Sequence, residues 1–310
     1  MLDAHDVYHR LKDELLELDI ERQSYNAKVS PFKYTFWCIF LGGGIVLFYF
    51  FNFTTIDLSP IWIIIYAGLV FVTFLVFQIV RFNNLDQFKK TFVNQIAPKV
   101  IEALGPTFSY RYQGGIPEQK IRGSMLFGEF HRYRYQDLVL GVINDIPIQF
   151  GEIKLIKRHS SGGDKKSTTI FSGIFFTAEI NLEFPTDIWM IHGHNSSTLR
   201  KRNKERVKGD HQMFRKYRVY SDNTALAKKI LQPSILDRID ALNRNLKRNN
   251  ITRYPVSYHF GGRHVDVCIN TQHKFMEPKL SRSVNSVEFI EQQTRLLNAL
   301  YGLLNELTLK

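Results

Sequence analysis

The chain has 310 residues, long enough for more than one structural unit, and a formal net charge of +12. Its two cysteines exclude a disulfide framework: Cys38 lies in an apolar run and Cys268 in a predicted strand, and no CxxC spacing offers a zinc or redox site. The excess of Lys and Arg leaves anionic surfaces, of lipid or of nucleic acid, as the partners that charge favours.

Two uncharged apolar runs, residues 34–53 and 61–80, predict membrane-spanning helices. A helix rises ~1.5 Å per residue, so each run would cross the ~30 Å hydrocarbon core of a bilayer. Neither run contains Asp, Glu, Lys, Arg or His, which argues against a transport path through them. Only the short link 54–60 separates the runs, so we predict an antiparallel transmembrane hairpin over residues 31–81.

Basic residues flank the hairpin at its two outer ends. Lys28 and Lys33 precede the first run, and Arg81, Lys89 and Lys90 follow the second, whereas the link carries none. Lys and Arg close to a membrane favour its cytoplasmic side. The sequence therefore predicts a multi-pass membrane protein with both termini in the cytoplasm.

Helical periodicity continues on both sides of the hairpin. Residues 1–30 form a predicted amphipathic helix with acidic polar positions, and residues 82–104 a predicted connecting helix with several lysines. We expect the two to pair antiparallel as a stalk, with ion pairs drawn from Glu17, Glu21, Lys89 and Lys90. The same apolar stripes would also suit packing against the globular domain or against a second subunit.

Residues 105–310 are predicted to form a separate cytoplasmic domain. Its first half contains strand-like runs at residues 127–135, 137–143, 146–157, 168–184 and 187–193. Asn144-Asp145 predicts a hairpin turn, and the apolar face switches near Gly151, which predicts a bulge or twist there.

The second half of this domain is richer in helix. A helix over 224–246 should break at Pro233, Gly261-Gly262 predicts a hairpin between strands 254–260 and 264–270, and a final amphipathic helix covers 289–309. Strands grouped ahead of helices predict an α+β fold of antiparallel strands with C-terminal helices.

Four segments in this order resemble the bacterial family DUF3137, whose function is not established. They are Asp137-x3-Gly141 with the run 148–155, then 171–176, then Phe214-x2-Tyr217-x-Val219-Tyr220-Ser221, and the helix with Leu231-x-Pro233. The resemblance covers about residues 80–280, and the hydrophobic hairpin matches in layout only. It implies a bacterial cytoplasmic (inner) membrane and supplies no catalytic, cofactor or ligand residues.

One group of side chains could support acid/base chemistry. Glu129 and His131 share a face of a predicted strand, and Asp137 and Glu152 lie nearby in the predicted sheet. Cross-strand ion pairs would explain the same residues without catalysis. The four residues are therefore catalytic candidates for a membrane-bound enzyme of unknown class, which remains the alternative function.

Two further patterns are too incomplete to predict a metal or a cofactor. His192-Gly-His194 offers two ligands where zinc sites use three or four. The run 162–167 has Lys165 at the glycine position that a phosphate loop requires. We expect neither a metal nor a cofactor.

Basic segments give the leading hypothesis for function. One predicted loop carries Arg200, Lys201, Arg202, Lys204, Arg206 and Lys208. For a domain tethered below an anionic leaflet, lipid headgroups are the simpler partner, at ~1 kcal/mol for each basic residue near the surface. We therefore expect a membrane-tethered cytoplasmic binding or scaffolding module, with an unidentified protein or a second copy as further partners and nucleic acid disfavoured.

Overall fold

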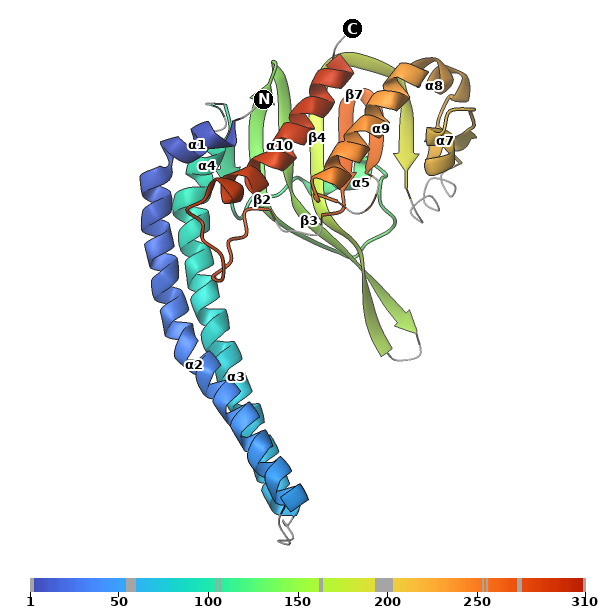
Figure 1. Cartoon of the computed structure of the whole chain (residues 1–310). Helices are drawn as coiled ribbons and strands as arrows, with labels where there is room; N and C mark the ends of the chain where they lie inside the picture. Colours follow the sequence, from blue (N-terminus) through green and yellow to red (C-terminus); the bar gives the residue numbers. More distant parts are fainter. Residues whose placement is uncertain are drawn as a thin grey trace. The chain divides into compact units, whose positions relative to one another are not determined.

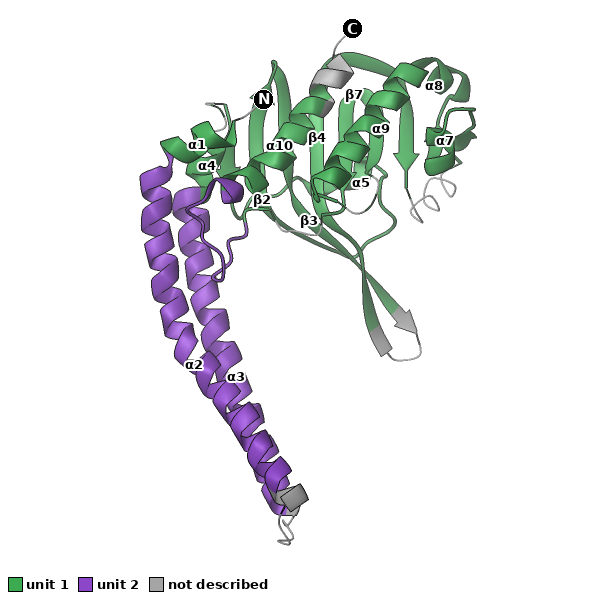
Figure 2. Cartoon of the chain, viewed as in Figure 1, with its two compact units in different colours: residues 1–10, 97–276, 290–310 green, residues 11–96, 277–289 purple. Residues whose placement is uncertain are grey.

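The computed structural model describes residues 3–53, 60–103, 105, 107–161, 164–192, 203–252, 254, 256–271 and 275–308. Its contacts divide the chain into two compact units (Figure 2). Unit 1 comprises residues 1–10, 97–276 and 290–310, and unit 2 comprises residues 11–96 and 277–289.

Unit 2 is built on two long helices, α2 (Lys12–Phe53) and α3 (Pro60–Thr91), that lie side by side (Figure 1). Both are long and apolar enough to cross a membrane, and no residue in the most apolar stretch of either helix is buried. Inside the predicted spans, the Tyr66 hydroxyl on α3 donates a 2.6 Å hydrogen bond to the Phe40 carbonyl on α2. A Cβ on Gly43 would overlap the Tyr66 ring, so the glycine permits close approach of the helices at this point.

The two helices remain paired beyond the apolar stretches, as the predicted stalk requires. The rings of Tyr25 on α2 and Phe88 on α3 lie 6.1 Å apart, and Thr91 Oγ1 lies 3.3 Å from Glu21 Oε1. One aromatic pair and one hydrogen bond between side chains therefore continue the interface beyond the apolar runs.

The ion pairs within unit 2 differ from the predicted ones. Lys89 Nζ lies 3.0 Å from Glu277, which belongs to a distant segment, and Lys90 Nζ lies 2.8 Å from Asp86 one helical turn earlier.

After α3 the chain makes one π-helical turn, η1 (Phe92–Ile96), close to Pro98, which cannot donate a main-chain hydrogen bond.

Segment 277–289 packs against the stalk through a buried polar contact, which we call the clasp. Asp19 on α2 is 6% exposed, and its carboxylate accepts a 2.9 Å hydrogen bond from the Val284 N–H and a 2.8 Å bond from Arg22 Nε. The Arg22 guanidinium also donates to the Leu280 carbonyl at 2.6 Å. One acidic and one basic side chain of α2 thus satisfy main-chain groups of a segment far along the chain.

Unit 1 contains a seven-stranded antiparallel sheet in the order β1-β2-β3-β4-β6-β5, with β7 also paired to β4. The strands are β1 (Ser109–Arg111), β2 (Arg132–Ile143), β3 (Ile146–Ser161), β4 (Asp164–Ile191), β5 (Glu205–Val207), β6 (Arg218–Ser221) and β7 (Ser257–Ile269). The helices are α1 (Ala4–Arg10), α4 (Ala97–Ala103), α5 (Glu118–Gly123), α7 (Met213–Lys216), α8 (Thr224–Ile230), α9 (Pro233–Arg248) and α10 (Val287–Thr308), whose first three residues belong to unit 2. The predicted α+β class is confirmed.

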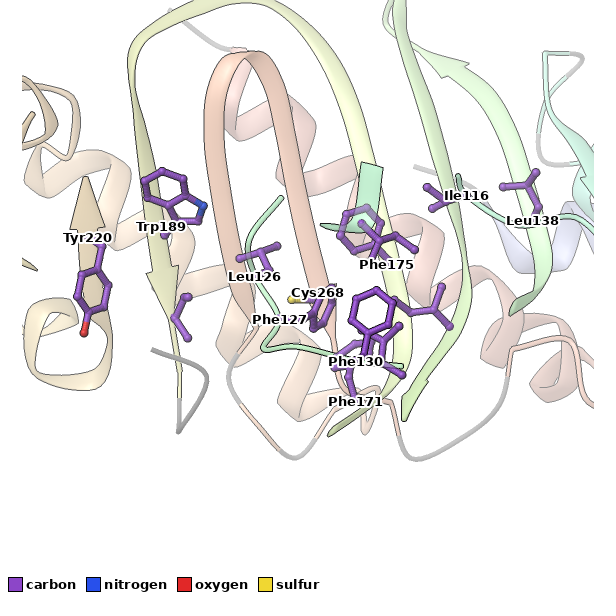
Figure 3. Close-up of a cluster of buried hydrophobic side chains, with 14 residues drawn as sticks. Ile116, Leu126, Phe127, Phe130, Leu138, Phe171, Phe175, Trp189, Tyr220 and Cys268 are labelled. Atoms are coloured by element: carbon purple, nitrogen blue, oxygen red, sulfur yellow. The ribbon is translucent and has the colours of Figure 1, made fainter. Parts of the chain in front are cut away.

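Strands β4 and β7 bend over together (Figure 3). One half of β7 pairs with Ile174–Glu179 and the other half with Ile188–Met190, and the register shifts between the two. The predicted hairpin at Gly261-Gly262 is therefore wrong in its pairing: both halves of β7 find their main-chain partners on β4. The glycines mark the bend, where Gly262 has a φ of +53°.

Local turn chemistry was predicted better. Asn144 and Asp145 join β2 to β3 with φ values of +49° and +63°, as a tight hairpin turn requires. The bulge predicted near Gly151 lies on the opposite strand, where Asp137 has a φ of +58°. The strand predicted from Phe127 begins instead at Arg132.

Side chains pack against both faces of the sheet. Inside the bend, Phe175, Trp189 and Cys268 pack against Leu126 and other residues that precede β2 (Figure 3). Helices α9 and α10 cover the other face, as Figure 1 shows. Burial of apolar surface on the two faces is the main source of stability for unit 1.

Candidate functional site

A buried charged cluster lies where β4 and β7 bend. His259 is 8% exposed, and its Nδ1 lies 2.9 Å from Oδ2 of Asp266, on the other half of β7. Its Nε2 lies 3.5 Å from Oδ1 of Asp187 on β4, an ion-pair contact rather than a well-formed hydrogen bond. The imidazole therefore lies between two carboxylates and connects three parts of the bend.

Trp189 fixes the orientation of the His259 ring. The two rings are nearly parallel, with centroids 5.1 Å apart, and Trp189 Nε1 donates a 2.9 Å hydrogen bond to the Ser124 carbonyl. Lys204 lies with its ammonium 5.0 Å from the indole centroid and pairs with Asp222. An aromatic ring next to cations is favourable because the face of the π-system is negative.

Only glycine fits at position 261 beside this cluster. A Cβ there would overlap Oδ1 of Asp187 and lie 2.8 Å from Nε2 of His259. In the part of the chain that the structure describes, His259 Nε2, Asp266 Oδ1 and Thr177 Oγ1 are buried without a hydrogen-bond partner. Thr177 on β4 is the direct register partner of Asp266 on β7, so the hydroxyl and the carboxylate face one another across the two strands.

The environment of the cluster favours a charged imidazole. Burial alone would lower the pKa of His259, but the carboxylates of Asp187 and Asp266 raise it above its ordinary value. His259 in turn lowers the pKa of Asp187, and the charge of Lys204 adds to this. The arrangement therefore favours the protonated form of the imidazole between the two carboxylates.

The residues around His259 do not favour nucleophilic catalysis or metal binding. Burial raises the pKa of the neighbouring Cys268 thiol, which keeps it protonated and poorly nucleophilic. Among the described residues no three His, Cys, Asp or Glu side chains converge as metal ligands. The two carboxylates contact opposite ring nitrogens of His259, so one ion could not bind all three groups.

Sequence reasoning missed this cluster, although a signal for it exists. His259 lies between the buried residues Tyr258 and Phe260, and Asp266 lies between Val265 and Val267. A charged residue at an inward position of an otherwise apolar strand calls for a buried partner.

The predicted acid/base residues Glu129 and His131 lie together at the surface. Both are exposed, with 4.0 Å between the carboxylate and the imidazole, and Glu129 also lies 3.4 Å from Lys157. His131 Nδ1 accepts a hydrogen bond from the Arg158 N–H at 3.2 Å. These contacts anchor the start of β2 to β3.

The other two candidates, Asp137 and Glu152, lie at a different position in the sheet, further along β2 and β3. Asp137 is buried and accepts a hydrogen bond from the Tyr110 hydroxyl, whose pKa is raised by burial and by this carboxylate. Glu152 accepts hydrogen bonds from Gln136 Nε2 and from the Phe275 N–H.

The four acid/base candidates therefore form two pairs. Gln136, which pairs with Glu152, lies five residues beyond His131, a rise of about 16 Å along an extended chain. No contact between described residues joins Glu129 or His131 to Asp137 or Glu152.

The predicted basic loop is described only in part. Arg200, Lys201 and Arg202 lie outside the described residues, as does His194 of the histidine pattern. Lys204 is held by Asp222 and Trp189, whereas Arg206 and Lys208 are exposed.

Fold and site together define the class: an α+β domain with a bent antiparallel sheet, in a chain with two candidate membrane-spanning helices. Residues 169–309 match the family described as "Protein of unknown function (DUF3137)", which confirms the predicted resemblance over that segment. The match runs from β4 to α10 and includes the His259 cluster, whereas Glu129, His131, Asp137 and Glu152 precede it. No curated protein and no solved structure matches the chain.

Proposed function

We propose that the chain is a two-pass protein of a bacterial cytoplasmic membrane, with both termini on the cytoplasmic side. The observation that carries this proposal is that no residue in the most apolar stretch of α2 or of α3 is buried, although both stretches are rich in large apolar side chains. Lys28, Lys33 and Arg81 flank the apolar runs on one side, and the link 54–60 contains no basic residue.

In this arrangement unit 1 acts as a membrane-tethered binding or scaffolding module that docks on anionic headgroups. Tethering converts docking into an intramolecular event, so weak individual contacts can suffice. The exposed Arg206 and Lys208, together with Arg200, Lys201 and Arg202 of the same segment, are one source of positive charge for this docking. A partner protein or a second copy of the chain would then be recruited at the leaflet.

The alternative is a membrane-bound enzyme that uses Glu129, His131, Asp137 and Glu152. Its geometric support is weaker, because these residues form two pairs about 16 Å apart along the sheet. One substrate atom could not contact both pairs.

Topology is tested by labelling engineered cysteines with a membrane-impermeant maleimide in intact cells. Cys38→Ala removes one native thiol, and the buried Cys268 contributes little background. Thr55→Cys, in the link, should react in intact cells, whereas Ala241→Cys, exposed on α9, should react only after lysis. The opposite pattern would refute the proposed orientation.

Docking is tested with the full chain in lipid nanodiscs. A donor fluorophore on Ala241→Cys and an acceptor on lipid headgroups report the distance of unit 1 from the leaflet. Energy transfer should increase when phosphatidylglycerol is added to phosphatidylcholine, and it should decrease again with salt because screening weakens surface charge. Equal transfer in both lipid compositions would contradict docking on anionic lipid while leaving the topology intact.

A further inference from the structure

Four exposed cations lie on one face of the sheet where β2 meets the β3–β4 hairpin: Arg132, Arg134, Lys154 and Arg158. We call this surface the basic face. Arg134 and Lys154 are direct register partners, and Arg132 is opposite Ile156. Because side chains alternate along a strand, all four project from the same side of the sheet. None of them has an ion-pair partner among the residues that the structure describes.

The basic face continues a surface that is covered elsewhere in unit 1. Phe150, on the same side of β3, packs against Phe275 with 5.6 Å between ring centroids. The next cross-strand row is polar, with Gln136 opposite Glu152, and the row after it holds Arg134 and Lys154. From there the β3–β4 hairpin projects beyond the helices that cover the sheet (Figure 1).

The charges of the basic face are unfavourable for the isolated domain. Like charges directly opposite each other in an antiparallel pair destabilise a sheet. The nearest acid, Glu152, already accepts hydrogen bonds from Gln136 and from the Phe275 N–H. On the other side of the same hairpin, Lys157 does have a carboxylate partner, Glu129, at 3.4 Å. Among the described residues, the cations of the basic face thus lack the carboxylate partner that Lys157 has on the other face.

The side chains present suit phosphate groups. Arg134, Lys154 and the exposed Ser172 are consecutive register partners on β2, β3 and β4, so a guanidinium, an ammonium and a hydroxyl form one row. Adjacent strands are ~4.8 Å apart, so the row spans about 10 Å. Arg and Lys bind phosphate oxygens through charge-assisted hydrogen bonds, to which hydroxyl groups add neutral ones.

We propose that the basic face binds the phosphate groups of anionic phospholipids and is the principal surface by which unit 1 docks on the leaflet. This inference rests on the proposed tethering and extends it, since it assigns docking to β2 and β3 rather than to segment 200–208. Lipid is the favoured anion because the chain carries its own candidate membrane anchor, which keeps a leaflet at high effective concentration.

The test compares charge variants of the full chain in the nanodisc assay described above. Arg134→Gln/Lys154→Gln removes two charges of the basic face and should weaken docking about 25-fold, roughly fivefold for each charge. Lys228→Gln/Lys229→Gln removes two charges from exposed positions of α8 and is the matched control. Arg134→Lys/Lys154→Arg keeps the charge and should dock like the unmodified chain, and unchanged thermal unfolding of all variants excludes misfolding.

Each outcome separates the two proposals. If Arg206→Gln/Lys208→Gln abolishes docking and the basic-face variant equals the control, docking stands and the basic face is refuted. If the unmodified chain shows no dependence on phosphatidylglycerol, lipid binding by the basic face is refuted, whereas cysteine labelling still decides the topology. If the chain in nanodiscs binds single-stranded RNA instead of anionic lipid, and the basic-face variant loses RNA binding, the assignment of the basic face to lipid is overturned.

Discussion

The clasp between Asp19 and segment 277–289 leads to a quantitative prediction. The Asp19 carboxylate accepts hydrogen bonds from Arg22 at 2.8 and 3.2 Å, from Gln23 at 3.1 Å and from the Val284 N–H at 2.9 Å. Burial alone would raise the pKa of Asp19, but these donors lower it below its ordinary value, so the group is charged at neutral pH. Asp19→Ala removes every one of these interactions at once.

The cost follows from what the substitution leaves behind. The Arg22 side chain is 11% exposed and would lose its counter-ion, although it keeps the Leu280 carbonyl as an acceptor. Breaking a buried ion pair by removing one partner costs about 3–5 kcal/mol. We therefore expect Asp19→Ala to lower the free energy that holds segment 277–289 on α2 by about 3 kcal/mol or more.

Hydrogen exchange of the full chain in nanodiscs measures this directly at Val284. A loss of about 3 kcal/mol corresponds to a decrease of roughly 150-fold in protection, since ~1.4 kcal/mol is a factor of ten. Glu17→Ala, at an exposed position of the same helix, is the control and should leave the protection unchanged. Equal protection of residues 277–289 in both variants would refute the clasp.

Three further predictions concern single positions. Because the two flanking carboxylates raise the pKa of His259, its ion pairs stabilise the fold fully below about pH 6.5 and are lost as pH rises through the raised pKa. The free energy of unfolding, followed by denaturant titration, should therefore fall on the alkaline side in the unmodified chain and not in His259→Gln. Gly261→Ala should cost about 1–3 kcal/mol in the same titration because its Cβ overlaps the charged cluster, whereas Gly123→Ala, with open space around it, should not. Gly43→Ala should lower the thermal stability of the hairpin in detergent, because the methyl group overlaps the Tyr66 ring; equal effects of Gly42→Ala would contradict this.

The features predicted correctly depend on short stretches of sequence. The two uncharged runs form long apolar helices, as their own residues predict, and Asn144-Asp145 adopts the positive φ values of its turn for local steric reasons. Pro233 begins α9 because it is tolerated at the first helical position and ends the preceding pattern.

The features predicted wrongly depend on distant partners. Gly261-Gly262 looks like a hairpin in isolation, but β4 is 28 residues long and offers main-chain partners to both halves of β7. The charge pattern of the stalk likewise did not include Glu277, which pairs with Lys89 from 188 residues away. Local periodicity contains no information about such contacts.

The candidate site shows the same limit. Glu129 and His131 were grouped with Asp137 and Glu152 because they are close in sequence and share strand periodicity. The strand begins only at Arg132 and a bulge intervenes at Asp137, so that periodicity does not extend over the whole run. The His259 cluster, by contrast, needs the bend of two strands to bring Asp187 beside the imidazole, and no spacing along the chain identifies Asp187 as the partner.

The division of the chain gives the clasp a role beyond stability. The backbone passes between the two units after residues 10, 96, 276 and 289, so unit 2 holds segment 277–289 while the residues on either side of it belong to unit 1. The clasp thus fixes the connection between β7 and α10 to α2 through the hydrogen bonds of Asp19 and Arg22, and Asp19→Ala tests this connection directly.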